Sequence, residues 1–476
     1  MLKTAFKRIL MIETCGIIVF MLYFSINYSK TRRKCDGSML DCKFNDNSTR
    51  TFVGVNNYIS KNENNSAFIN IHEVFSDICS KINITQNISD VESSWSSVDN
   101  TRRVFVYSAY HVQNKIVVIA AKTSVVKRVF CQLWYQRNNT DGFFLSQISA
   151  TATTLPESHG YRYASSFIDC PIDSDKVPEY VSIVTEKCQD PKHFLRVQSA
   201  VKPHNHERKF TVCLPPLNLN YSKAYEFVEW VELNRILGAE KFLIYKHCVA
   251  KNIEQVLDYY TKQGLVDVLS WNLPMSTRYF HGDKRVHEIH YFGQVAALND
   301  CLYRNKKSSK FVVNVDLDEF IVPHSKHMQT WSDIVNNSKP SENVYLFRNT
   351  FFKKDWESSK ALFDADDTKF IEKYNIVTLQ KIKHERKVFS PKMRSKYFAR
   401  TSEVGRLMIH DVPAAKIGTV DTNVGLLHHY RFWGGVNDSE SMKVYDDTIP
   451  VKYGKQLLAN IAKVWSQLTN VNLGTD

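Results

Sequence analysis

Two aspartates near the middle of the chain, Asp316 and Asp318, are the residues whose type and spacing best suit chemistry. They follow an apolar run, residues 311–315, that predicts a buried strand. Carboxylates at the end of such a strand are poor core residues, because an unpaired buried carboxylate is too costly. Two carboxylates one residue apart can instead converge on Mg²⁺ or Mn²⁺, and a substrate's phosphates complete the octahedron. The pattern predicts a metal site for a nucleoside-diphosphate leaving group, with an acidic turn as the structural alternative.

The segment that must position these aspartates alternates between strand and helix patterns from about residue 209. This alternation predicts an α/β fold, a mainly parallel sheet flanked by helices, which binds ligands where its strands end. An amphipathic helix is expected to close the chain. The expected strands are residues 210–216, 241–247, 266–271 and 310–323, and the expected helices are residues 225–239, 252–264, 289–307 and 452–471.

The residues before this segment have a different character. Short runs rich in β-branched and aromatic residues predict strands in residues 101–205, which we interpret as a β-rich N-terminal part preceding a main domain of residues 206–476. Three cysteines of this part are expected to staple it: Cys131, Cys170 and Cys188. Net charge is +13, but the basic residues are spread along the whole chain without a reading motif, so we expect no nucleic-acid partner.

Residues 9–26 form an apolar run of transmembrane length, about 27 Å as a helix. The bulky residues that end it are unlike a cleavage site, which weakens the alternative of a signal peptide. Residues 1–8 would then be a cytosolic tail, and the Asn-rich residues 27–100 a glycosylated stem. The run predicts a signal anchor.

Two further features predict that the body of the chain lies in the secretory lumen. Nine of the ten cysteines follow the apolar run, as an oxidising compartment favours. Eight N-glycosylation sequons are spread over the body of the chain, and one more lies at Asn27 beside the apolar run. The expected topology is therefore single-pass type II. The eight sequons of the body begin at Asn47, Asn64, Asn83, Asn87, Asn138, Asn220, Asn336 and Asn437.

About two thirds of the chain resembles glycosyltransferase family 92. The matching stretches are VYSAYHV, FCQLW, FTVCLPPL, GAEKFLIY, YFGQVAALNDCLYRN, VNVDLDEFIVP, KYFARTSEVGRLMIH and LLHHYR. The resemblance implies a GT-A fold in a Golgi membrane protein. It also implies an inverting, metal-dependent transferase that moves a sugar, expected to be galactose, from a UDP-sugar to a glycan acceptor. Mn²⁺ or Mg²⁺ would be the cofactor.

The resemblance also implies roles for single residues. Asp318 would bind the cation, Asp316 would contact the cation or the ribose, and His429 would be the third protein ligand. His428 and His429 would point to opposite sides of an extended segment, so only one can reach the metal. A packing role for this histidine remains open. The remaining donor-binding candidates are Gln294, Asn299, Asp300, Lys396 and Arg431, with capping, packing or ordinary ion pairing as the alternatives.

An inverting transferase needs a general base near the acceptor hydroxyl. Asp355, Asp364 and Asp411 are candidates by residue type, and the sequence does not choose among them. A phosphatase that places Asp-x-Asp after a strand is a rival reading, although Phe320 stands where it would have Thr or Val. A lumenal carbohydrate-binding protein without catalytic activity is the other rival, and the intact Asp316, Asp318 and His429 argue against it.

Overall fold

The computed structural model describes residues 74–75, 79, 82, 93–137, 143–173, 176–277, 287–359, 362–432 and 439–474. All of them belong to one compact unit, Asn62–Asp476. The predicted tail at 1–8, the predicted anchor at 9–26 and most of the predicted stem at 27–100 lie outside the described residues.

The expected localisation, a single-pass type II Golgi membrane protein, is not supported and is withdrawn. Within the described part of the chain, no helix combines the length and the apolar character needed to cross a bilayer.

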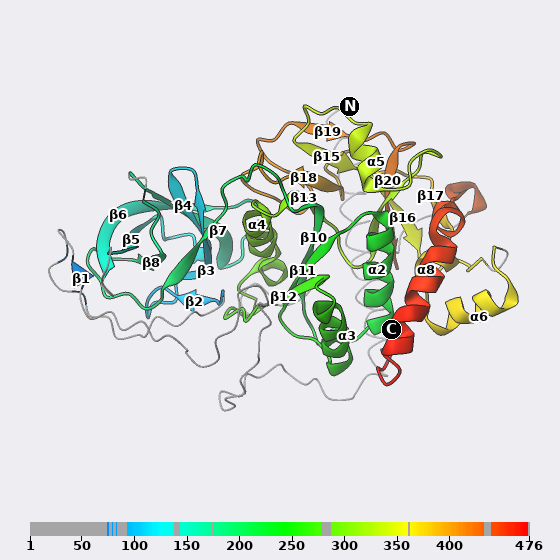
Figure 1. Cartoon of the computed structure of the whole chain (residues 1–476), viewed down its shortest axis with the longest axis horizontal. Helices are drawn as coiled ribbons and strands as arrows, with labels where there is room; N and C mark the ends of the chain where they lie inside the picture. Colours follow the sequence, from blue (N-terminus) through cyan, green and yellow to red (C-terminus); the bar gives the residue numbers. More distant parts are fainter. Residues whose placement is uncertain are drawn as a thin grey trace, which may run out of the picture. The chain divides into compact units, whose positions relative to one another are not determined.

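Seven strands between residues 104 and 199 form a closed barrel (Figure 1). Their order around the barrel is β6-β5-β8-β9-β3-β4-β7, and pairing between β6 and β7 closes it. A Cys131–Cys170 disulfide joins β5 to β7, and Cys79–Cys188 fastens the preceding segment. The barrel strands are β3 (Val104–Val112), β4 (Lys115–Thr123), β5 (Arg128–Gln136), β6 (Phe143–Thr154), β7 (Tyr163–Pro171), β8 (Tyr180–Val184) and β9 (Leu195–Ser199), with the two-residue strands β1 (Val74–Phe75) and β2 (Ser96–Ser97) at its margin.

Strands β3 and β4 are apolar on both faces because each face contributes to a different core. Val104 and Val106 point into the barrel core, whereas Phe105 and Tyr107 join a second core outside it. Strand side chains alternate in this way because successive residues point to opposite faces. The second core also contains much of helix α4 (Gln294–Asn305), so the barrel packs against the helix that precedes the two aspartates.

A seven-stranded sheet follows, in the order β12-β11-β10-β13-β18-β15-β19. Its first four strands are parallel, whereas β18 runs antiparallel to both β13 and β15. A Cys213–Cys301 disulfide ties α4 to β10. The strands are β10 (Arg208–Leu217), β11 (Lys241–Lys246), β12 (Val266–Ser270), β13 (Ser309–Asn314), β15 (Val344–Phe347), β18 (Lys396–Arg400) and β19 (Ile417–Thr419), and the helices beside them are α2 (Ala224–Leu237) and α3 (Lys251–Lys262).

A third, five-stranded sheet has the order β14-β20-β16-β17-β21. Helix α8 packs on α2, with Tyr453, Leu457 and Ile461 in the same core as Phe227 and Val231. The strands are β14 (Glu319–Pro323), β16 (Asn349–Lys353), β17 (Lys383–Glu385), β20 (Gly425–Arg431) and β21 (Lys443–Tyr445), and the remaining helices are η2 (His290–Gly293), α5 (Trp331–Asn336), α6 (Ala365–Lys373), α7 (Val377–Gln380), η3 (Glu440–Met442) and α8 (Thr448–Gln467).

The predicted fold class, α/β with a mainly parallel sheet, is wrong. The described residues are mostly β-structure, with a closed barrel, two further sheets and more antiparallel than parallel ladders. Strand–helix alternation is confined to residues 208–314, and three- to seven-residue strands follow it. Such short strands pair with partners far away in sequence, and no local period of the sequence reveals that pairing.

Candidate active site

Asp316 and Asp318 lie in the short connection from β13 to β14, where the central parallel strand leaves the sheet. The connection is held by its backbone: Trp230 Nε1 donates to the Asp316 carbonyl over 2.9 Å, and the Tyr430 amide donates to the Asp318 carbonyl over 2.7 Å. The Asp316 amide donates to Glu319 Oε2 over 3.0 Å. Because these bonds use main-chain atoms, both aspartate carboxylates stay available for other partners.

A cavity of about 890 Å³ opens beside this connection. Its wall combines the end of β10 and the loop to α2, the η2 segment, residues 316–319, the end of β20, and Glu157 and His159 from the barrel. Seven of the thirteen described non-glycine residues with positive φ line it. Such backbone is strained and gathers at functional sites. They are Glu157, His159, Leu219, Asn220, Tyr291, Phe292 and Arg394.

His429 faces the second aspartate across the strand pair β14–β20, in which Glu319 is directly opposite His429. Its Nε2 lies 3.2 Å from Asp318 Oδ2, and its Nδ1 lies 3.3 Å from Glu319 Oε1. The Asn349 amide nitrogen, a donor, also lies 3.0 Å from Nδ1, so these contacts favour the tautomer whose Nε2 proton is donated to Asp318. A cation bound between Asp318 and His429 would replace that proton.

Charges around Asp318 keep it ionised. Burial acts to raise the pKa of its carboxyl, but His429, Lys354 and Arg431 outweigh burial and hold the pKa well below its usual range. The carboxylate is therefore the stable form at neutral pH.

Lys396 is fully buried and bridges two carboxylates, with Nζ 3.0 Å from Asp316 Oδ2 and 3.2 Å from Glu319 Oε2. Burial alone would lower the pKa of this lysine, but Asp316 and Glu319 raise it above its ordinary value. Burial raises the pKa of Glu319 to about 7 against the effect of Lys396. Asp316 Oδ1 is buried and has no hydrogen-bond partner among the described residues. One Asp316 oxygen is thus held by lysine, and the other is left for a further ligand.

Cationic side chains share the cavity wall with these acids. Lys223, Lys354, Arg394 and Arg431 line it, and Lys354 Nζ lies 2.9 Å from Glu226 Oε1. An acidic pair, a histidine and several cations on one wall are suited to a polyanionic ligand bound with a divalent cation.

Comparison with known proteins shows which family the chain resembles. Residues 208–462, more than half of the chain, match glycosyltransferase family 92. The chain belongs to glycosyltransferase family 92. The match includes both aspartates, Lys396 and His429, but not the barrel.

Two curated relatives of this family 92 chain come from Caenorhabditis elegans. Beta-1,4-galactosyltransferase galt-1 is 27% identical over 177 residues, which cover 35% of this chain and 40% of the relative. A glycosyltransferase family 92 protein is 29% identical over 113 residues, covering 24% and 22%. The matches thus span less than half the length of either relative. A Staphylococcus aureus TarS structure in complex with UDP covers 56% of this chain and 66% of its own at 10% identity, and its TM-score of 0.25 is too low to carry an argument.

The donor-binding candidates of the family 92 chain fall into two groups. Gln294 and Arg431 line the cavity with Asp316, whereas Asn299, Asp300 and Lys396 do not. Asn299 clamps Leu407, accepting from its amide over 2.8 Å and donating to its carbonyl over 2.9 Å. These two hydrogen bonds hold α4 against Leu407, so Asn299 has a packing role.

Asp300 is a fully buried junction between barrel and sheet. Its carboxylate accepts hydrogen bonds from Ser108 and, over 2.6 Å each, from the hydroxyls of Tyr110 and Tyr245, and Arg304 Nε lies 3.2 Å away. All of these partners hold the barrel against the sheet, so Asp300 has a structural role.

None of the three candidate bases lines the cavity. Asp355 is half exposed beside Lys353, Asp364 caps α6 by accepting from two backbone amides, and Asp411 pairs with Lys392 over 3.1 Å. The cavity instead contains Glu157, a barrel residue that sequence reasoning missed. Its position after β6 gave no signal, because only the packing of the barrel brings it to the site.

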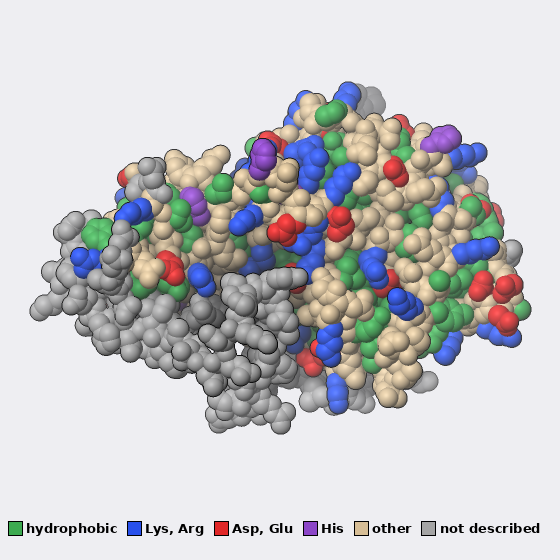
Figure 2. All heavy atoms as spheres, in the orientation of Figure 1, with side chains coloured by type: hydrophobic (Ala, Val, Ile, Leu, Met, Phe, Trp, Pro, Cys, Tyr) green, Lys and Arg blue, Asp and Glu red, His purple; other side chains and the backbone are tan. Residues whose placement is uncertain are grey.

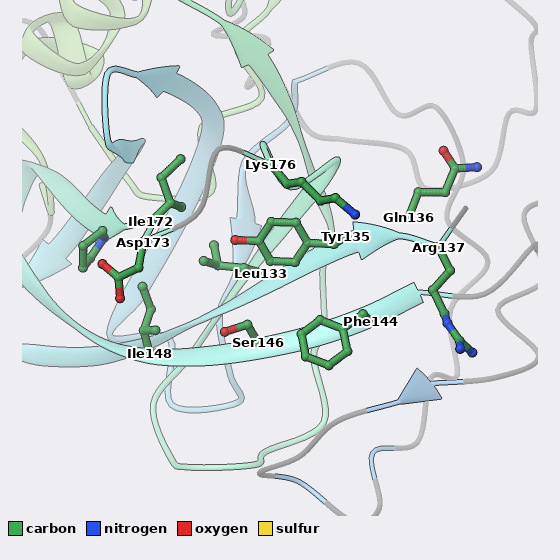
Figure 3. A pocket seen from close by; sticks show the side chains of 11 residues that line it. Leu133, Tyr135, Gln136, Arg137, Phe144, Ser146, Ile148, Ile172, Asp173 and Lys176 are labelled. Carbon is green, nitrogen blue, oxygen red and sulfur yellow. The ribbon is translucent and has the colours of Figure 1, made fainter. Parts of the chain in front are cut away.

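A second concavity of about 680 Å³ lies beside β5 and β6, on the face of these strands that carries the barrel core (Figure 3). Tyr135, Ile148 and Phe144 give it an apolar wall, and Asp173 is its one carboxylate among the described residues. Without a pair of acids or a histidine it lacks the chemistry of the first cavity.

Proposed function

We propose that this family 92 chain is a metal-dependent glycosyltransferase that moves a hexose, galactose being the first candidate, from a UDP-sugar to a hydroxyl of a glycan. The observation that carries the proposal is the pairing of Asp318 with His429 on the wall of a cavity that also holds Arg431. A diphosphate needs both a cation held by carboxylate and imidazole, and positive side chains around it.

The residues present fit a divalent cation. Asp318 Oδ2 and His429 Nε2 lie 3.2 Å apart, and the buried Asp316 Oδ1 has no hydrogen-bond partner in the part of the chain that the structure describes. Oxygen ligands with one imidazole suit Mn²⁺ or Mg²⁺. A cation held there would supply positive charge to the departing diphosphate.

The remaining chemistry falls to side chains of the chain itself. Arg431, Arg394 and Lys354 can pair with the phosphates, whose charge grows as the glycosidic bond breaks. Gln294, at the start of α4, lines the same wall and can hydrogen-bond the donor. On the face shown in Figure 2 the basic side chains are interspersed with acidic ones. The cavity wall likewise combines Lys and Arg side chains with carboxylates.

Glu157 is our candidate for the general base. It lines the cavity together with Asp316 and Asp318, and its Oε2 accepts from the Ile409 amide over 3.1 Å. Burial raises the pKa of its carboxyl, although the Ile409 amide, His159 and Lys396 oppose that effect. A base must be near the acceptor and have a pKa moved toward the working pH, and Glu157 satisfies the second condition and lines the right cavity.

A transfer assay tests the proposed function. The full-length chain is incubated with a panel of UDP-sugars, Mn²⁺ and glycan acceptors, and both free UDP and glycosylated product are measured. We expect turnover with at least one donor and its loss after chelation. Sugar or UDP binding without any turnover would favour the carbohydrate-binding alternative, and full turnover after exhaustive chelation would refute the role of the cation.

A further inference from the structure

The neighbouring histidines of β20 face two different acids. His429 faces Asp318 in the cavity, whereas His428 points to the other face of the strand. There it meets His324, which directly follows β14, and Asp446, which lies between β21 and α8. The ligand atoms of His324, His428 and Asp446 all lie within 4.8 Å of one another.

The separations within this cluster are short. The two Nε2 atoms of His324 and His428 are 2.7 Å apart, and Asp446 Oδ2 lies 3.6 Å from the first and 3.4 Å from the second. Two bare imidazole nitrogens at this distance can share only one proton, and the carboxylate oxygen is beyond hydrogen-bond distance of both. The contacts among the three side chains therefore satisfy only part of their hydrogen-bonding capacity.

One oxygen of the Asp446 carboxylate, Oδ2, has no hydrogen-bond partner within the described residues. The side chain is buried, with an exposure of 7%. Lys452 is close enough to act on its charge but donates its Nζ hydrogens to the carbonyls of Pro323, Ser325 and Met328. A buried carboxylate oxygen without a partner is costly, unless another ligand satisfies it.

Neighbouring contacts hold the cluster in position. The Thr448 amide donates to Asp446 Oδ1 over 3.0 Å, which turns Oδ2 toward the histidines. Phe352 stacks on His428 with ring centroids 4.3 Å apart. A set of ligands oriented in advance by second contacts is typical of metal sites.

We propose that His324, His428 and Asp446 bind a structural Zn²⁺ ion. Two imidazoles and one carboxylate are ligands that Zn²⁺ accepts, and ligand atoms around a tetrahedral Zn²⁺ lie about 3.4 Å apart. Both distances to Asp446 Oδ2 agree with this value, and the two imidazoles need only a small separation.

The position of the cluster indicates a structural role. None of its three residues lines the cavity, so a substrate in the cavity does not reach this ion. The ion would join the end of β14, the middle of β20 and the segment before α8, which are far apart in sequence. Since β20 also carries His429, the ion would fix the strand from behind, and this inference stands whether or not the proposed transferase activity is found.

Metal analysis of the full-length chain tests the proposal. An Asp318→Asn background removes the cation ligand of the cavity, so this protein, equilibrated with ZnCl₂ and then dialysed, should retain about one zinc ion per chain by mass spectrometry. In that background Asp446→Asn and His324→Gln should lower the retained zinc at least tenfold. Asp355→Asn, at a half-exposed aspartate outside both the cavity and the cluster, should leave the zinc content unchanged and serves as the matched control.

A second readout keeps the proposal testable if the variants fold poorly. Chelator-stripped wild-type protein titrated with CoCl₂ should develop the intense visible absorption of tetrahedral cobalt, and adding ZnCl₂ should abolish it. Zinc should also raise the melting temperature of the stripped protein. Wild-type protein that retains no zinc, an octahedral cobalt spectrum, or an Asp446→Asn variant that keeps its zinc would each overturn the proposal.

Discussion

The barrel and the cavity bury polar groups in opposite ways. On the faces of β5 and β8 that point away from the barrel core, the buried polar side chains Gln132 and Ser182 are uncharged, and Ser182 contacts Trp134 and the carbonyl of the equally buried His193. Beside the cavity, Glu319 and Lys396 are buried as an ion pair. The barrel is stabilised by burial of apolar area, which is tolerant of small changes, whereas the cavity depends on each charge keeping its partner.

This contrast teaches where function is concentrated. Pairing buried charges adds little net stability, because desolvation offsets most of the attraction. A chain that nevertheless buries three charged or ionisable side chains around one strand end has arranged them for a ligand. The three are Glu319, Lys396 and His429.

In the cavity, Asp318→Asn should have the largest effect, a loss of transfer activity. The amide is nearly isosteric, so the fold should survive, but the charge offered to a cation is lost. Several kcal/mol of leaving-group stabilisation disappear with it, and turnover should fall about a thousandfold. The measurement is transfer at saturating donor and Mn²⁺, after similar melting of wild type and variant has been established.

Asp355→Asn is the matched control for that experiment, because the same chemical change is made at a half-exposed aspartate outside the cavity. Its activity should stay within about twofold of wild type. If Asp318→Asn kept more than about a tenth of the activity, a loss below about 1.4 kcal/mol, the role given to Asp318 would be wrong.

Lys396→Met should show that the buried charges are interdependent. The variant leaves Glu319 buried without its cation, and removing one partner of a buried pair costs at least about 3 kcal/mol of the free energy of unfolding. Chemical denaturation measures this loss. Lys392→Met, which removes an exposed lysine paired with Asp411, should cost less than about 1 kcal/mol. Equal losses in the two variants would contradict the distinction.

Glu157→Gln should link the two regions, since this barrel residue lines the cavity. If Glu157 is the general base, kcat should fall about a hundredfold. The wild-type enzyme should lose activity as pH drops through the pKa of Glu157, which burial raises, and the variant should lack that acid limb. A variant with the wild-type pH profile would exclude Glu157 as the base.

The sequence predicted those residues and elements that a short stretch of sequence is enough to indicate. Asp316 and Asp318 follow an apolar strand directly, and the helices at 224–237, 251–262 and 294–305 follow a 3.6-residue period. The resemblance, and no local pattern, pointed to His429. Closure of the barrel through β6 and β7 was not predictable, because it depends on pairing between strands whose order a local pattern does not give.

Glu157 and the cluster around His428 were missed for the same reason. Glu157 comes to the cavity through the packing of the barrel, more than 150 residues before Asp318 in sequence. The candidate bases Asp355, Asp364 and Asp411 were chosen by residue type, and type does not report distance from a cavity. His428 was recognised only as the histidine that points away, and its partners His324 and Asp446 lie on other elements.

In the barrel, His193 provides the test with the smallest expected effect, a change in how stability depends on pH. Its Nε2 accepts from the Ile183 amide over 3.1 Å, its Nδ1 has no partner within the described part of the chain, and burial lowers its pKa to about 4. The folded state therefore holds this histidine neutral, whereas the unfolded chain takes up a proton near pH 6.5. Between these values the unfolded state binds more protons, so stability falls as the pH falls.

The size of this effect follows from the same two pKa values. Above about pH 6.5, protonation of His193 in the unfolded chain does not lower the free energy of unfolding. On going from pH 6.5 to pH 5 the free energy of unfolding should fall by about 2 kcal/mol. His193→Gln keeps an acceptor for the Ile183 amide but cannot be protonated, so it should remove that part of the pH dependence. Denaturant midpoints of wild type and variant at pH 7 and pH 5 give the comparison. Identical pH dependence in the two proteins would mean that His193 takes up its proton without unfolding the barrel, and that the surroundings of this side chain are less apolar than their residues indicate.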